Sequence, residues 1–171
     1  MSGLKWLLVG AGDIARKRVA AALRDAADSE LVGVCDVVED NAQSLADEYG
    51  VGEVFTDLGE ALGKSTAEAV YVATPVGLHV AHAVRALEAG KHVLVEKPLG
   101  LSREMCQQAI AAAEKSGKKA GCSYYRRLFP AYQQAREMIE KGEFGRIVLA
   151  RMVYFSWFAP ETDDPKFWRV V

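Results

Sequence analysis

A glycine-rich turn near the N-terminus has the residue types and the spacing of an anion-binding site. Gly10-Ala11-Gly12-Asp13-Ile14-Ala15 directly follows the apolar run 6–9 and opens a stretch of helical character. A strand that turns tightly into a helix points free backbone N–H groups outward at the positive end of the helix dipole, which suits a pyrophosphate. Gly10 allows the tight turn, Gly12 leaves the backbone open to a phosphate, and Ala15 takes the position that packs the helix against the strand.

Asp36 supplies a second functional group, about twenty residues past the turn, at the end of another apolar run. A carboxylate at the tip of the second strand can accept hydrogen bonds from both hydroxyls of an adenosine ribose, and its charge repels a 2′-phosphate. Val37 and Val38 follow, so no Lys or Arg stands there to hold such a phosphate. The sequence therefore favours NAD over NADP as the cofactor. The alternative role of Asp36 is to cap the next helix, but Asp40 is the better cap, which would leave Asp36 free.

Glu96-Lys97-Pro98 ends a later apolar run and holds the candidate catalytic residue, Lys97. Beside a nicotinamide this lysine would be partly desolvated, and it could donate a hydrogen bond to a substrate oxygen or help move a proton as a carbonyl forms. Glu96 can pair with it and hold its charge in place. Pro98 would make the turn rigid, and a cis bond would re-aim the lysine, although only about 5–6% of X–Pro bonds are cis. A surface Glu–Lys pair before a loop proline is the alternative.

Two further polar clusters also follow strand-like runs. In Ala73-Thr74-Pro75, the threonine stands where the nicotinamide ribose and the phosphates should pass, and His79 in the next helix either faces the cofactor or packs. Pro75 is equally typical of an ordinary helix start. Tyr125, Arg126 and Arg127 suit the recognition of substrate hydroxyls or carboxylates, with a solvated helix entry as the alternative.

Alternating strands and helices must position these residues. Between Lys5 and Ser123 the pattern predicts an α/β fold, a doubly wound parallel sheet of the NAD(P)-binding Rossmann type, over residues 1–123. Ligands of such sheets bind beyond the carboxyl ends of the strands, and these polar residues fall at those ends. Strands are expected at 6–9, 31–36, 54–55, 69–73, 91–95 and 119–123, and helices at 14–27, 41–49, 58–62, 76–89 and 102–115.

The pattern changes after Ser123. A helix is expected at 130–141, and 145–157 is predicted to be one long apolar strand with no partner strands after it. We interpret residues 124–171 as the incomplete start of a second, C-terminal α+β domain. The long apolar strand should recruit another chain, so a homo-oligomer is expected.

The composition excludes several classes of protein. The 171 residues carry a net charge of −2 without a basic run, which argues against nucleic-acid binding. No apolar stretch reaches the ~18 residues of a membrane span, and the N-terminus lacks the pattern of a secretory signal. Three widely spaced cysteines indicate reduced thiols in a cytoplasmic protein, and the three histidines lack partners at metal-ligand spacing, so no metal is expected.

Together these motifs resemble the Gfo/Idh/MocA family of NAD(P)-dependent oxidoreductases (glucose–fructose oxidoreductase, inositol 2-dehydrogenase and rhizopine catabolism). The matching segments are the opening turn, Ala73-Thr74-Pro75 with His79, the run Ala89-Gly90-Lys91-His92-Val93-Leu94-Val95-Glu96-Lys97-Pro98, and Arg126-Arg127 before Pro130. The resemblance implies that Lys97 is the substrate-contacting catalytic lysine, that its bond to Pro98 is cis, and that Glu96 lies near the nicotinamide. It further implies hydride transfer between the nicotinamide and a sugar, inositol or related polyol.

The chain departs from this family in length. Family members are about twice as long and, after a segment comparable to Phe167-Trp168-Arg169, carry a Gly-rich stretch and an Asp-x-Gly-x-His motif whose histidine is the proton-transferring partner of the lysine. This chain therefore carries the cofactor half of such an enzyme and is expected to be inactive alone. The alternative is a non-catalytic dinucleotide-binding module with a redox-sensing or regulatory role.

Overall fold

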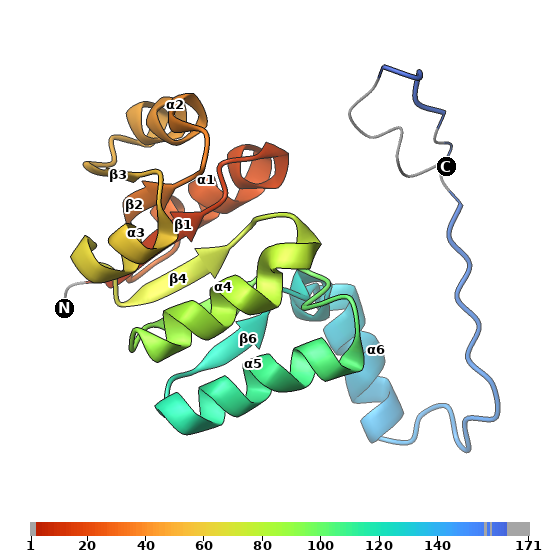
Figure 1. Ribbon diagram of the computed structural model, residues 1–171. Coiled ribbons are helices and arrows are strands. Elements are labelled where there is room, and N and C mark those ends of the chain that lie inside the picture. The colour runs from red at the N-terminus through yellow and green to blue at the C-terminus, as the bar shows by residue number, and fades with distance from the viewer. Residues whose placement is uncertain (1–2, 156, 158, 164–171) are drawn as a thin grey trace. The chain divides into compact units, whose positions relative to one another are not determined.

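The computed structural model describes residues 3–155, 157 and 159–163, and the chain divides into two compact units, Met1–Tyr125 and Arg126–Val171 (Figure 1). The first unit holds the six strands of the described part of the chain and the helical segments that alternate with them. It therefore contains the whole of the predicted sheet.

The first unit is built on one sheet of six parallel strands in the order β3-β2-β1-β4-β5-β6. β1 lies between β2 and β4, so the order reverses beside it, as in a doubly wound sheet. The predicted fold class is therefore confirmed. The strands are β1 (Leu4–Val9), β2 (Ser29–Cys35), β3 (Glu53–Phe55), β4 (Ala69–Val72), β5 (His92–Val95) and β6 (Ala120–Cys122).

The helices lie close to their predicted positions. The first begins at Asp13 and contains a π-helical segment, η1 (Ala15–Val19), before α1 (Ala20–Asp25); it ends two residues earlier than predicted. The others are α2 (Glu39–Tyr49), α3 (Leu58–Lys64), α4 (Val76–Glu88) and α5 (Arg103–Ser116). Ser102 caps α5 by accepting the Met105 N–H.

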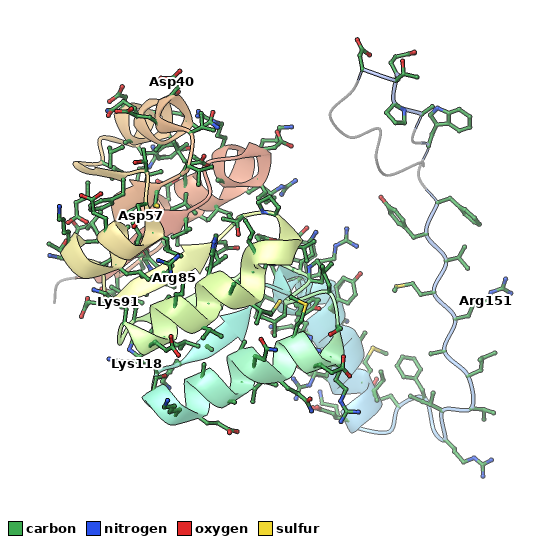
Figure 2. All side chains as sticks on the ribbon, viewed as in Figure 1. Asp40, Asp57, Arg85, Lys91, Lys118 and Arg151 are labelled. Carbon is green, nitrogen blue, oxygen red and sulfur yellow. The ribbon has the colours of Figure 1, made fainter. Side chains whose placement is uncertain are left out.

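The prediction that Asp40 caps α2 is wrong. The helix begins at Glu39 with Val38 as its N-cap residue, so Asp40 lies inside the first turn, exposed on the outer surface (Figure 2). The Val38 N–H instead donates a hydrogen bond to Asp36 Oδ1 at 2.9 Å. The carboxylate at the strand end therefore shapes the entry to the helix.

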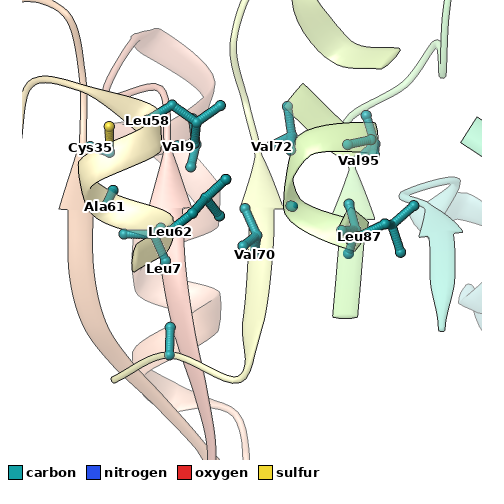
Figure 3. Close-up of a cluster of buried hydrophobic side chains, with 14 residues drawn as sticks. Leu7, Val9, Cys35, Leu58, Ala61, Leu62, Val70, Val72, Leu87 and Val95 are labelled. Carbon is teal, nitrogen blue, oxygen red and sulfur yellow. The ribbon is translucent and has the colours of Figure 1, made fainter. Parts of the chain in front are cut away.

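Alternate residues of the central strands face two separate apolar layers. Leu7, Val9, Val70 and Val72 pack with residues of α3 and α4 in one buried cluster (Figure 3). Leu8 and Tyr71 point the other way, into a second cluster with residues of α1 and α2. Burial on both faces explains why the strands read as continuous apolar runs.

The second unit contains one long helix, α6 (Pro130–Glu140), close to the helix predicted there. A short 3-10 segment, η2 (Tyr125–Leu128), lies at the boundary of the two units. The long strand predicted from 145 to 157 is not formed between residues 145 and 155, where the chain adopts neither helix nor strand. Strand structure needs a hydrogen-bonded neighbour, and none of the described residues pairs with this segment. Ser156 and the segment Phe167-Trp168-Arg169 lie outside the described residues.

Candidate functional site

The carboxyl ends of the strands are held in register, so the predicted site residues meet at one edge of the sheet. The Gly10 N–H donates to the Cys35 carbonyl at 2.8 Å, and the Ala73 N–H donates to the Val9 carbonyl at 2.7 Å. The Glu96 N–H donates to the Val72 carbonyl at 2.9 Å. The glycine turn, the loop after β4 and the loop after β5 therefore begin side by side.

The glycine turn has the geometry that its sequence predicts. Gly10 has φ +96°, and a Cβ there would lie 2.7 Å from the backbone carbon and oxygen of Ala73. Gly12, by contrast, has nothing within 4 Å of where its Cβ would be, so its backbone is open to a ligand. Ala15 is fully buried, as the helix–strand packing position requires. Asp13, which begins the helix, pairs on the surface with Lys17 at 2.7 Å.

Asp36 is not free, contrary to the sequence-based expectation. Its Oδ2 accepts the Ala11 N–H of the glycine turn at 2.7 Å, while Oδ1 accepts the Val38 N–H. A carboxylate has about four lone-pair sites, so acceptor capacity remains for ribose hydroxyls. The same side chain thus fixes the backbone of the turn and presents its charge at the strand tip.

A cavity of about 450 Å³ lies at this edge of the sheet. Its lining includes the predicted residues Gly10, Gly12, Asp36, Ala73, Thr74 and Pro75. Four other polar residues line it that no sequence pattern placed there: Thr56, Asp57, which caps α3, and His82 and Arg85 of α4. Figure 2 shows Asp57 and Arg85 on neighbouring helices. The residues next to Asp36 in sequence carry no positive charge. Arg85 brings one to the same cavity from α4, which is distant in sequence.

His82 connects the cavity to the loop after β4. Its Nδ1 lies 3.3 Å from Thr74 Oγ1. Burial, the nearby Arg85 charge and His79 all lower the pKa of His82, so the ring is neutral at pH 7. The threonine that we expected to lie along the nicotinamide ribose is therefore held by a neutral imidazole.

Glu96 is turned into the protein and does not pair with the side chain of Lys97. Its Oε1 accepts the Tyr71 hydroxyl at 2.7 Å, and its Oε2 accepts the backbone N–H of Lys97 at 3.1 Å. Glu96 is buried, whereas Lys97 is exposed rather than partly desolvated. The expected Glu96–Lys97 ion pair is absent among the described residues. The Lys97-Pro98 peptide bond is cis, as the resemblance implied.

Tyr71 is a residue of this site that sequence reasoning missed. It lies in the middle of the apolar strand β4, where its ring packs near Trp6 and its hydroxyl contacts both Glu96 and Ser123. Burial, together with the neighbouring carboxylate, raises the pKa of the Tyr71 hydroxyl, so it is a neutral donor. The available signal was a tyrosine inside an otherwise apolar run, because a buried hydroxyl needs a partner.

Replacing Tyr71 with phenylalanine should destabilise the chain by about 1–3 kcal/mol, because the buried Glu96 carboxylate loses a donor. Urea unfolding of the Tyr71→Phe variant measures this directly. Tyr49→Phe is the matched control, because phenylalanine keeps the aromatic ring that lies under the Arg24 guanidinium. This control variant should change the free energy of unfolding by about 0.5 kcal/mol or less. Equal stability of Tyr71→Phe and the parent chain would show that the hydroxyl does not support Glu96.

A second cavity, of about 530 Å³, opens on the other face of the sheet. Tyr125 lines it together with Tyr71, Glu96 and Ser123, beside apolar side chains of the first helix and β5. The structure thus brings Tyr125 near the end of β5. Arg126 and Arg127 belong to the second unit, and their roles stay predictions.

His79 is nearly fully buried, at 2% exposure, and both of its ring nitrogens contact backbone carbonyl oxygens. It therefore lies beneath the site and does not line the 450 Å³ cavity. Its predicted role toward the cofactor stays a prediction, and the geometry favours an indirect one.

The remaining titratable groups form no metal centre in the part of the chain that the structure describes. There, no group of three or more His, Cys, Asp or Glu side chains gathers at metal-binding distance. Cys35, Cys106 and Cys122 are free thiols, and burial raises the pKa of Cys35 to about 11. No helix in the described ranges is both long enough and apolar enough to cross a membrane.

Comparisons with known proteins show similarity both in sequence and in fold. The family model described as "Oxidoreductase family, NAD-binding Rossmann fold" matches residues 4–124. The 1,5-anhydro-D-fructose reductase of Ensifer adhaerens is 33% identical over 166 residues, which are 97% of this chain and 49% of that protein. The chain spans about half the length of the curated relatives it matches.

Two solved structures share the fold. The scyllo-inositol dehydrogenase from Lactobacillus casei, with bound NAD(H) and scyllo-inositol, has a TM-score of 0.79 and 27% identity; the match covers 84% of this chain and 43% of that one. KijD10, a 3-ketoreductase from Actinomadura kijaniata in complex with TDP-benzene and NADP, has a TM-score of 0.76 and 29% identity, over 82% and 44% of the two chains. One of these proteins holds NAD(H) and the other NADP, so the comparisons leave the choice between the two cofactors open.

Proposed function

Because the chain belongs to the Gfo/Idh/MocA oxidoreductase family, which has an NAD-binding Rossmann fold, we propose that it is the cofactor half of an NAD(P)-dependent oxidoreductase acting on CH–OH groups. The substrate would be a sugar, an inositol or a related polyol, in line with the names of the relatives. The observation that carries the proposal is the convergence of the open glycine turn, the Asp36 carboxylate and the loop of Lys97 on one edge of the sheet.

The residues at this edge suit a dinucleotide. The pyrophosphate would lie over Gly12, where a Cβ would find no atom within 4 Å, against the N–H groups that begin the first helix. Asp36 would accept hydrogen bonds from the adenosine ribose. The adenosine would occupy the 450 Å³ cavity. We propose NAD as the preferred cofactor, although Arg85 offers a positive charge in the same cavity.

The remaining predicted residues would surround the nicotinamide end. Ala73, Thr74 and Pro75 form the loop after β4, and Glu96 and Pro98 flank Lys97 in the loop after β5. When bound, the nicotinamide would accept or supply the hydride. Lys97 Nζ would donate a hydrogen bond to the substrate oxygen. This hydrogen bond would stabilise the negative charge that develops on that oxygen as hydroxyl and carbonyl interconvert.

The rest of the substrate site is proposed to involve the second unit. Tyr125, Arg126 and Arg127 would contact substrate hydroxyls or carboxylates, and residues 124–171 would begin the substrate and dimerisation domain. A second proton-transferring group would come from the half of the relatives that this chain does not span. We also propose that the protein acts as a homo-oligomer.

The chain should bind NADH by itself, because the dinucleotide edge belongs wholly to the first unit. Calorimetric titration with NADH should show saturable binding below millimolar ligand. No binding at millimolar NADH would overturn the assignment of the glycine turn. The reaction itself is tested on a full-length protein that contains this chain and is as long as the relatives. Each of a panel of sugars and inositols is added, and the absorbance of NADH is followed.

A redox-sensing or regulatory module is the less favoured function. The retained Lys97 argues against it, because a pure sensor has no use for a substrate-contacting lysine. The relatives are also named as reductases and dehydrogenases.

A further inference from the structure

His79 joins two loops of the candidate site through its imidazole ring. Its Nε2 lies 2.7 Å from the carbonyl oxygen of Thr74, in the loop after β4. Its Nδ1 lies 2.8 Å from the carbonyl oxygen of Pro98, in the loop after β5. Both distances are those of hydrogen bonds, and the ring is 2% exposed, so water does not replace either contact.

The chemistry of these two contacts determines the protonation state of the ring. A carbonyl oxygen can only accept a hydrogen bond, so each ring nitrogen must donate. A neutral imidazole carries one N–H and would turn the lone pair of its other nitrogen toward a carbonyl oxygen. Two donated hydrogen bonds need a proton on each nitrogen, and a ring so protonated is a buried cation held between two carbonyl dipoles.

The loop after β5 lies tightly against α4 near this contact. A Cβ on Gly100 would be 2.9 Å from Val80 Cγ2 and 3.3 Å from Cys106 Sγ. Val80 directly follows His79 on the helix. The loop that carries Lys97 is thus fixed to α4 at two points, the Pro98 carbonyl and Gly100.

We propose that His79, as an imidazolium, is a positioning residue that ties the loop of Lys97 to the loop of Thr74. It acts through these two residues and touches neither cofactor nor substrate. Its importance for hydride transfer rests on the proposed function, whereas its effect on the two loops does not.

The other two histidines provide internal controls. His92 Nδ1 accepts the Lys119 N–H at 3.0 Å, so that nitrogen carries no proton and the ring is neutral. His82, whose pKa is lowered mainly by burial, is neutral as well. His79 should therefore be the one imidazolium among the three histidines near pH 7.5.

Long-range ¹H–¹⁵N correlation spectra of the ¹⁵N-labelled chain test this directly. We expect two nitrogens of the protonated type for His79, and one protonated plus one unprotonated nitrogen for His92 and His82. The His79 signals are assigned by their loss in His79→Gln. A neutral His79 ring in the parent chain would overturn the proposal, and this readout does not depend on cofactor binding.

The positioning role is tested by comparing His79→Gln with the control His92→Gln. Glutamine cannot bridge both carbonyls, so amide hydrogen exchange in the loops at 96–101 and 73–75 should rise about tenfold in His79→Gln only. NADH affinity should fall about tenfold, while ADP-ribose, which lacks the nicotinamide, should lose less than about threefold. Unchanged loop exchange, or an equal loss for both ligands, would contradict the role. If the parent chain bound no NADH, the proposed function would be wrong. The hydrogen-exchange data would still show whether His79 holds the two loops together.

Discussion

Replacing Gly12 with alanine should lower NADH affinity by about a hundredfold and leave the fold intact, because the new methyl group enters only the space proposed for the pyrophosphate. Apart from Gly12 and its two chain neighbours, no described residue has a heavy atom within 4 Å of that Cβ position. Displacing the phosphate lengthens several charge-assisted hydrogen bonds to backbone N–H groups at once. Calorimetry measures the NADH affinity of Gly12→Ala. Urea unfolding of this variant should give the same stability as that of the parent chain.

Gly10→Ala should behave in the opposite way. Its Cβ would meet the Ala73 backbone at 2.7 Å, in a residue with φ +96°, so the folded state should lose roughly 2–4 kcal/mol. Gly52→Ala is the matched control, since its Cβ would also point into open space, away from the glycine turn. Tight NADH binding by Gly12→Ala would show that the phosphates do not lie over this turn.

Asp36→Ala should remove most of the discrimination between NADH and NADPH. NADH affinity should fall by about ten- to a hundredfold, because the ribose hydroxyls lose a charged acceptor. NADPH affinity should hold or rise, because the carboxylate no longer repels the 2′-phosphate. Paired titrations with the two cofactors give the ratio.

Asp36→Ala should also cost stability, about 1–3 kcal/mol, since the N–H groups of Ala11 and Val38 both lose their acceptor. Asp36→Asn keeps one carbonyl oxygen and should recover part of that loss without recovering the NADH preference. The control is Asp40→Ala, an exposed acid in the first turn of α2, which should change neither quantity appreciably. An unchanged cofactor ratio in Asp36→Ala would mean that this carboxylate only shapes the turn.

The sequence predicts the parts of the site that depend on neighbouring residues. The glycine turn, the strand ends at Asp36 and Glu96, and the cap at Ser102 each follow from a short pattern of residue types. Contacts between distant segments could not be read in this way. Tyr71 and Glu96 are 25 residues apart, and Arg85 reaches the cavity of Asp36 from another helix.

The wrong predictions have the same physical origin. Asp40 has the right residue type for a cap, but the bond from Val38 to Asp36 starts the helix earlier. Residues 145–155 have the composition of a strand, yet strand structure depends on a partner that local composition does not supply.

The position of β1 in the middle of the sheet has a consequence for the order of events during synthesis. Its neighbour on one side, β2, follows within some twenty residues, but β4 is made roughly sixty residues after β1 ends. At about 5–20 residues per second, one side of β1 stays unpaired on the ribosome for about 3–12 seconds. Gly10 packs against Ala73, just beyond β4, so the nascent chain has to reach this point before the cofactor edge can close.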